Sequence, residues 1–284
     1  MNYTKVTKTR QDFTDTPPRA GYMELKNTVF RKETNLLLLL LDFDECKGKT
    51  HHCHPFATCF NERGSYSCKC KHGYFGNGFH CRNLKSCSEI RQYGSSVSRN
   101  YMIDPDGFGG LAPFTVYCDM TDNTGVGVTV ISHDSETRTL VKGYEAIGGY
   151  SRDIHYTGAS LPQLASLTRV SSHCEQFIKY ECHGSVLLYN NDPRGWWVSR
   201  DSTKMRYWGG ASGNGKCACG MTKSCADPSD GCNCDKNDYV WREDSGLLTD
   251  KTKLPVKQLR FGDTGDKDEK GFFTLGKFKC YGTV

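Results

Sequence analysis

The sequence predicts two disulfide-stabilised units in succession, a small, cysteine-dense β module over residues 42–82 and a larger α+β domain over residues 83–284. The chain has 284 residues, which is enough for one to three domains. Its 16 cysteines are an even number, and paired cysteines persist in oxidising compartments, so we expect an extracellular protein. Six cysteines fall within residues 42–82 and the other ten within residues 83–284, which separates the two units.

Residues 1–41 have no cysteine and no clear hydrophobic period, and we expect a disordered or mis-called N-terminal tail. The apolar run Leu36–Leu41 is shorter than the core of a secretory signal, and far shorter than the roughly twenty residues of a membrane span. Residues 1–35 carry three of the five net positive charges. The rest of the chain is nearly balanced, with no basic stripe interleaved with aromatics, so nucleic-acid binding is not expected.

Residues 42–82 are too few to bury a sufficient apolar core, so this module needs covalent staples. Its cysteine spacing, C-x6-C-x5-C-x8-C-x-C-x10-C, resembles that of the EGF-like family. Spacing alone leaves fifteen connectivities open. The resemblance implies a small disulfide-rich β fold with the pairs Cys46–Cys59, Cys53–Cys68 and Cys70–Cys81.

Acidic residues before the first cysteine, together with Asn61 and Tyr66 between the third and fourth, resemble the calcium-binding subclass of EGF-like modules. Calcium is a hard cation that takes six to eight oxygen ligands, and extracellular modules bind it weakly, at about 10⁻⁴–10⁻³ M. Asp42, Glu45 and Asn61 offer side-chain oxygens. The resemblance adds the backbone carbonyls of Phe43, Glu62 and Ser65. The alternative is a plain EGF-like module whose acidic residues are merely solvated.

Residues 83–284 show short strand signals and one helical period, which predicts an α+β domain with many loops. Phe114–Tyr117 and Val126–Ile131 are rich in β-branched and aromatic residues, as strands are. Residues 159–170 carry leucines and valine at helical spacing. Glycine clusters at 107–110, 209–215 and 262–265 predict turns.

Blocks along this second unit resemble a known family. Cys87–Ile90, Tyr101–Gly107 and Pro113–Met120 are similar to the start of a fibrinogen C-terminal domain. Later blocks are similar to the fibrinogen-like segment of contactin-associated proteins and neurexin IV, and the resemblance covers residues 87–284 almost continuously. These blocks are His173–Gln176, Tyr207–Gly210, Lys216–Gly220, Cys232–Asp235, Leu254–Val256 and Cys280–Gly282.

That resemblance implies a fibrinogen C-terminal-like fold, cell adhesion or matrix function through extracellular or cell-surface protein partners, and no catalysis. The family continues into laminin G modules and a membrane span, whereas this chain stops at Val284, so we expect a fragment or a short secreted form. An alternative is a secreted fibrinogen-related lectin that recognises acetylated sugars. No Gly-x-Ser-x-Gly motif or Cys/His signature nominates a hydrolase.

Disulfides of the second unit are only partly predicted by resemblance. Cys87 and Cys118 match a fibrinogen-type bridge, and Cys182 and Cys280 match a bridge of the more distant fibrillar collagen C-propeptides. The remaining six cysteines stay unassigned: Cys174, Cys217, Cys219, Cys225, Cys232 and Cys234.

Four further binding-site hypotheses each have a simpler structural alternative. A zinc cluster at Cys217, Cys219, Cys225, Cys232 and Cys234 is disfavoured, because structural zinc sites use wider spacing than C-x-C. An acidic loop with Asp227, Asp230, Asp235 and Asp238 is more simply solvated than a second calcium site. Residues His51, His52 and His54 offer metal ligands but are expected to be exposed. Trp196, Trp197 and Trp208 offer a recognition surface, although tryptophans of this kind more often belong to a core.

Overall fold

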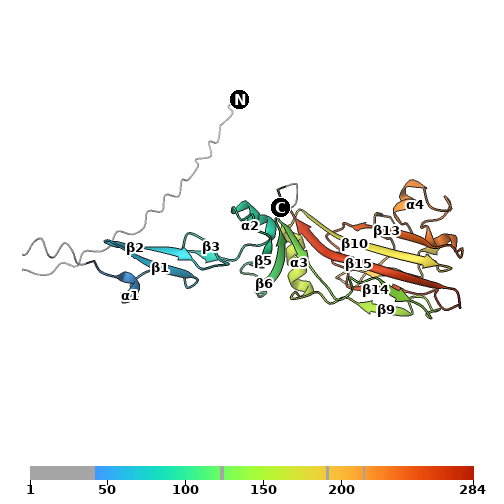
Figure 1. Cartoon of the computed structure of the whole chain (residues 1–284), viewed down its shortest axis with the longest axis horizontal. Coiled ribbons are helices and arrows are strands. Elements are labelled where there is room, and N and C mark those ends of the chain that lie inside the picture. Colours follow the sequence, from blue (N-terminus) through green and yellow to red (C-terminus); the bar gives the residue numbers. More distant parts are fainter. Residues whose placement is uncertain (1–41, 122–124, 190–191, 214) are drawn as a thin grey trace, which may run out of the picture. The chain divides into compact units, whose positions relative to one another are not determined.

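A computed structural model describes residues 42–121, 125–189, 192–213 and 215–284 of this protein, so the expected N-terminal tail at 1–41 lies outside the described residues. The described residues divide into two compact units. The first contains residues 42–72 and 76–81, and the second contains residues 73–75 and 82–284. Figure 1 shows the strands and helices of each unit in sequence colours.

The first unit begins with a short helix and an antiparallel strand pair, and a second short strand pair lies at its boundary in the sequence. Helix α1 (Glu45–Gly48) begins at Asp44, whose carboxylate accepts the Lys47 amide at 2.9 Å and so caps the helix. Strands β1 (Ala57–Glu62) and β2 (Ser65–Cys70) form a hairpin, and β3 (Phe75–Gly76) pairs with β4 (Cys81–Arg82). Its three disulfides join Cys46 to Cys59, Cys53 to Cys68 and Cys70 to Cys81, which are the pairs implied by the EGF-like resemblance.

The second unit contains a seven-stranded antiparallel sheet in the order β13-β10-β15-β7-β6-β5, with β8 also paired to β15. One face of this sheet is buried, because residues along β10 and β15 alternate between buried and more exposed positions. The strands are β5 (Arg99–Ile103), β6 (Phe114–Asp119), β7 (Val128–Ile131), β8 (Thr139–Val141), β10 (His173–His183), β13 (Arg242–Leu248) and β15 (Lys270–Tyr281).

A second, four-stranded sheet has the order β12-β11-β14-β9. Figure 1 places β14 and β9 below β10 and β15 in the view of the second unit. These strands are β9 (Tyr150–Asp153), β11 (Trp196–Val198), β12 (Lys204–Met205) and β14 (Gln258–Phe261).

Among the described residues of the second unit, the helices are one longer helix and three short ones. Helix α3 (Leu161–Val170) has a capping box, in which Ser160 and Gln163 satisfy each other's backbone amides, and it confirms the helix predicted over 159–170. The strands predicted at Phe114–Tyr117 and Val126–Ile131 correspond to β6 and β7. The short elements are α2 (Cys87–Gln92), α4 (Ala218–Thr222) and the 3-10 helix η3 (Cys234–Lys236).

Aromatic rings fill the core of the second unit. Phe261 of β14 stacks on Tyr180 of β10, with ring centroids 4.6 Å apart, and on Phe273 of β15 at 5.7 Å. Trp208 packs its edge against Phe261 and donates its indole N–H to the Asp244 carbonyl at 3.0 Å. Such stacked and edge-to-face pairs bind the two sheets together beyond the apolar area that they bury. Of the three tryptophans considered from the sequence, Trp197 and Trp208 are fully buried.

All sixteen cysteines are paired, and one predicted pair is wrong. The antiparallel register places Cys174 opposite Cys280, whereas Cys182 lies at the other end of β10, opposite Gly271. A Cys182–Cys280 bridge is therefore out of reach. Cys182 instead pairs with Cys234 on η3. The other bridges of this unit are Cys87–Cys118, Cys174–Cys280, Cys217–Cys232 and Cys219–Cys225.

Candidate functional site

Two of the three side chains predicted to bind calcium meet where the segment before α1 contacts the β1–β2 hairpin. We call this place the mouth of the EGF-like unit. Asp42 precedes α1, and one oxygen of its carboxylate accepts the side-chain amide of Asn61 at 2.6 Å. Its other oxygen accepts the backbone N–H of Gly64, also at 2.6 Å. Because Cys46–Cys59 ties α1 to β1, the segment that precedes α1 closes onto the β1–β2 hairpin.

The electrostatics of this mouth favour an anionic centre. The backbone N–H of Gly64 lowers the pKa of Asp42, and the Asn61 amide lowers this pKa further. Glu45 enters from the first turn of α1, and its Oε2 atom is buried without a hydrogen-bond partner among the described residues. A buried, unpartnered carboxylate oxygen is costly unless a ligand or ion satisfies it. Thus the Glu45 carboxylate has one oxygen available for a cation.

The residues present at this mouth fit a calcium ion. Asp42, Glu45 and the Asn61 amide supply hard oxygen donors, which calcium prefers. Glu62 and Ser65 face each other at the end of the hairpin, next to the pair formed by Asn61 and Tyr66. The resemblance implies that their carbonyls would complete the calcium shell.

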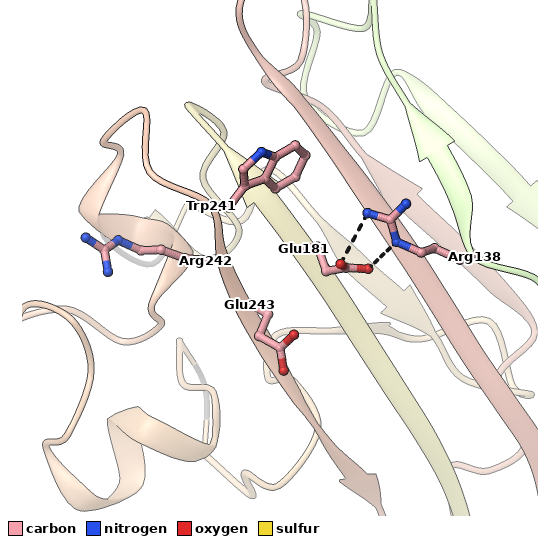
Figure 2. Close-up of a pocket in the computed structure, with 5 residues that line it drawn as sticks. All are labelled: Arg138, Glu181, Trp241, Arg242 and Glu243. Carbon is pink, nitrogen blue, oxygen red and sulfur yellow. Dashed lines mark hydrogen bonds and ion pairs between the residues drawn. The ribbon is translucent and has the colours of Figure 1, made fainter.

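The outer face of the seven-stranded sheet carries a recess that the sequence did not suggest. Its volume is about 370 Å³. Figure 2 shows the five side chains that line it. We call it the Trp241 recess, since Trp241 projects beside it and is 47% exposed. Its lining residues are Arg138, Glu181, Trp241, Arg242 and Glu243.

Side chains in and beside the Trp241 recess are held by one another. The Arg138 guanidinium donates to both oxygens of Glu181, at 2.7 and 3.2 Å (Figure 2). It also lies 3.3 Å from the ring centroid of Phe272. This guanidinium is the largest cause that lowers the pKa of Glu181. The Trp241 ring lies 5.2 Å from that of His183 and 5.8 Å from that of Phe272. A surface that is ordered before binding loses less entropy when a partner docks.

A second hollow, of about 350 Å³, lies further along the same sheet face. Phe177 of β10 and Leu247 of β13 stand opposite each other in its lining, and both are exposed large apolar residues. Lys277 and Glu136 form an ion pair at 3.0 Å on its rim. Residues 173–183 alternate between buried and more exposed positions, a period that is a sequence signal for a half-exposed strand, but this period does not identify which exposed residues cluster.

Within the described residues, the acidic-loop and zinc hypotheses gather no set of free metal ligands, and His51 lies near Cys53 and Cys59, which are both disulfide-bonded. The carboxylate of Asp235 is buried and accepts the amides of Leu187 and Leu188, at 3.0 and 2.8 Å. Asp238 pairs with Arg242, and Asp227 accepts hydrogen bonds from Ser229. The acidic loop therefore does not converge on one point. All five cysteines of the zinc hypothesis belong to disulfides, so their thiolates are not available.

Comparison with known proteins finds a family match in each of the two units and relatives that span both. The calcium-binding EGF domain family matches residues 42–81, and the family of the C-terminal globular domain of fibrinogen beta and gamma chains matches residues 83–146. Human contactin-associated protein 1 is 37% identical over 249 residues, covering 84% of this chain. Neurexin-4 of Drosophila melanogaster is 37% identical over 242 residues, covering 81% of this chain. This chain is a homologue of contactin-associated protein 1 and neurexin-4.

The homology confirms the family and the two-part fold predicted from the sequence. It also extends well beyond residues 83–146, since the aligned region covers 84% of the chain. The chain spans 18–19% of the length of these two relatives. Both domain types and the eight disulfides place these residues outside the cell. Among the described residues, no helix is long and apolar enough to cross a bilayer.

Proposed function

We propose that this contactin-associated protein homologue is an extracellular adhesion or matrix protein in which calcium stiffens the EGF-like unit and the fibrinogen-like unit binds a protein partner. The observation that carries the proposal is the Trp241 recess on an open sheet face, in a homologue of two surface-associated proteins. Its lining is rich in the aromatic and arginine side chains that dominate protein interfaces.

Calcium has a structural role in this proposal. The ion would be held by the side chains of Asp42, Glu45 and Asn61, with the carbonyls of Phe43, Glu62 and Ser65 completing the shell. It would supply positive charge to a mouth that carries the Asp42 carboxylate and the unpartnered Glu45 oxygen. The support comes from the contact between Asp42 and Asn61 and from the unpartnered Glu45 oxygen. The segment that precedes α1 would then be fixed to the hairpin more firmly than by hydrogen bonds alone.

The first partner to test is contactin, because the name of contactin-associated protein 1 states that association for that relative. We expect the full chain to bind an immobilised contactin ectodomain in surface plasmon resonance. Trp241→Ala should weaken this binding about 30-fold, since truncating an interface hot spot costs about 2 kcal/mol or more. Phe108→Ala provides the matched control, because Phe108 is a fully exposed aromatic outside the recess lining. An equal loss in both variants, or no binding by the parent protein, contradicts the proposal.

A further inference from the structure

The four-stranded sheet carries three cations around Trp196. Trp196 of β11 lies opposite Arg260 of β14 in the strand register. Strand β12, which pairs with the other edge of β11, contributes Lys204. The Lys204 ammonium lies 3.7 Å from the centroid of the Trp196 ring. Arg206 follows Lys204 with the buried Met205 between them, so both cations extend from the same side of this segment. We call these four residues the cationic platform.

The cations of the platform are held by neutral groups. Arg260 donates from Nε to the Gln258 side-chain oxygen at 2.7 Å and from Nη1 to the Gly148 carbonyl at 3.4 Å. Lys204 rests on the indole ring of Trp196. Within the ranges that the structure describes, neither of these residues nor Arg206 forms an ion pair with a carboxylate. The platform therefore keeps its full positive charge.

Carboxylates close to the platform in the sequence or the sheet form ion pairs or hydrogen bonds with other residues. Asp192 lies 3.7 Å from Arg194, and Asp153 accepts the side-chain amide of Gln258 at 2.5 Å. Burial lowers the pKa of Lys204, and the positive charge of Arg206 lowers it further, while Asp192 has the opposite effect. Holding like charges together costs free energy, and among the described residues Asp192 offsets this cost at Lys204 only in part.

Some other cations of the same unit are ion-paired. Lys253 pairs with Asp201 at 3.1 Å, Lys277 with Glu136 at 3.0 Å, and Arg82 with Glu89 at 2.7 Å. At the platform, three cations without such a partner gather around one indole ring, and an external anion would provide the partner.

We propose that the cationic platform binds a sulfated polysaccharide of the glycosaminoglycan type. Residues on β12 and β14 are separated by two strand spacings, about 10 Å, so the cations are spread over a surface that a polymer of repeating sulfates can follow. A protein partner is less suited to this surface, because the core of a protein interface needs exposed apolar area. Among the described residues, no large apolar side chain that is exposed belongs to β9, β11, β12 or β14.

The test measures binding of the full chain to immobilised heparin by surface plasmon resonance. The parent protein should bind heparin and should dissociate from it as salt is raised. The Debye screening length shortens from about 10 Å at 0.1 M salt to about 3 Å at 1 M salt, which weakens the attraction between the opposite charges. The triple variant Lys204→Gln/Arg206→Gln/Arg260→Gln should bind roughly tenfold or more weakly, since local positive charge raises the concentration of anions near a surface by that order.

The matched control removes the same three charges from ion-paired positions. The variant Lys253→Gln/Lys277→Gln/Arg82→Gln should retain heparin affinity within about twofold. Melting temperatures of all variants are compared first. If the platform triple variant unfolds, Lys204→Gln alone should still weaken binding about threefold. The proposal is overturned if the parent protein does not bind heparin, or if the control variant loses as much heparin affinity as the platform variant. It is also overturned if desulfated heparin or polyglutamate binds as well as heparin.

Discussion

Replacing Cys174 and Cys280 together by alanine will lower the free energy of unfolding of the second unit by about 5 kcal/mol. The bridge joins cysteines separated by 106 residues, so its loss releases a very long loop in the unfolded protein. Because β10 and β15 stay paired by their backbone hydrogen bonds, the native fold can persist in the variant at reduced stability. Tryptophan fluorescence in a denaturant titration measures this change, since all four tryptophans lie in the second unit.

The matched control for this prediction is the double variant of Cys219 and Cys225. Their bridge closes a loop with a sequence separation of 6, so the same reasoning gives a cost of about 2 kcal/mol. Disulfide mapping by mass spectrometry checks the pairing itself and should recover a peptide pair that contains Cys182 and Cys234. Equal destabilisation in both double variants, or a peptide pair linking Cys182 to Cys280, contradicts this account.

Asp235→Ala will destabilise the second unit by about 2 to 4 kcal/mol, because two buried backbone amides lose their acceptor. The Asp235 carboxylate is 4% exposed and accepts the amides of Leu187 and Leu188 through one oxygen. Asp235→Asn keeps an oxygen at that position and so retains both hydrogen bonds. Chemical denaturation of the two variants, with Asp227→Asn as an exposed control, separates the loss of hydrogen bonds from the loss of charge.

The same residue gives the second unit a dependence on pH. Burial raises the pKa of Asp235 to about 7, and the charges of Asp244 and Asp230 add to this effect. A carboxyl group whose pKa is higher in the folded protein than in the unfolded protein stabilises the fold fully below its unfolded pKa, which is 3.8 here. This stabilisation is lost progressively as pH rises toward the folded pKa of about 7. The stability advantage of Asp235→Asn over the parent protein should therefore grow by about 2 kcal/mol between pH 5 and pH 7.

Titration of His133 does not affect this comparison. Burial lowers the pKa of His133, so its contribution is lost as pH falls, which is the opposite direction. Because His133 is present in both proteins, its contribution cancels in the difference. A difference between parent and Asp235→Asn that stays constant from pH 5 to pH 7 contradicts the buried-carboxylate account.

The sequence predicted local structure and the EGF-like disulfides well, because both depend on short-range patterns. The capped helix at Leu161–Val170 and the strands β6 and β7 lie where periodicity and residue type placed them. The six cysteines of residues 42–82 pair as the EGF-like resemblance implies. Asp42 and Asn61, which are far apart in the sequence, meet because the Cys46–Cys59 bridge lies between them.

Features that depend on strand register could not be predicted. Cys182 and Cys280 belong to neighbouring strands, yet a register that pairs Cys174 with Cys280 separates them. The Trp241 recess has the same origin, because Arg138, Glu181 and Trp241 come from three segments that only the assembled sheet brings together. Sequence pattern identifies which residues face outward, but the tertiary pairing of strands decides which of them become neighbours.

Calorimetric titration of calcium into the full chain tests the calcium site most directly. The parent protein should bind one calcium ion at the EGF-like unit, with a dissociation constant of about 10⁻⁴–10⁻³ M. Asn61→Ala should weaken binding about tenfold, because it removes an oxygen donor from the mouth. Asn77→Ala, which alters an asparagine bonded to the amides of Phe79 and His80 elsewhere in the module, should leave the isotherm unchanged. A flat isotherm for the parent protein, or identical isotherms for the parent and Asn61→Ala, would contradict the site.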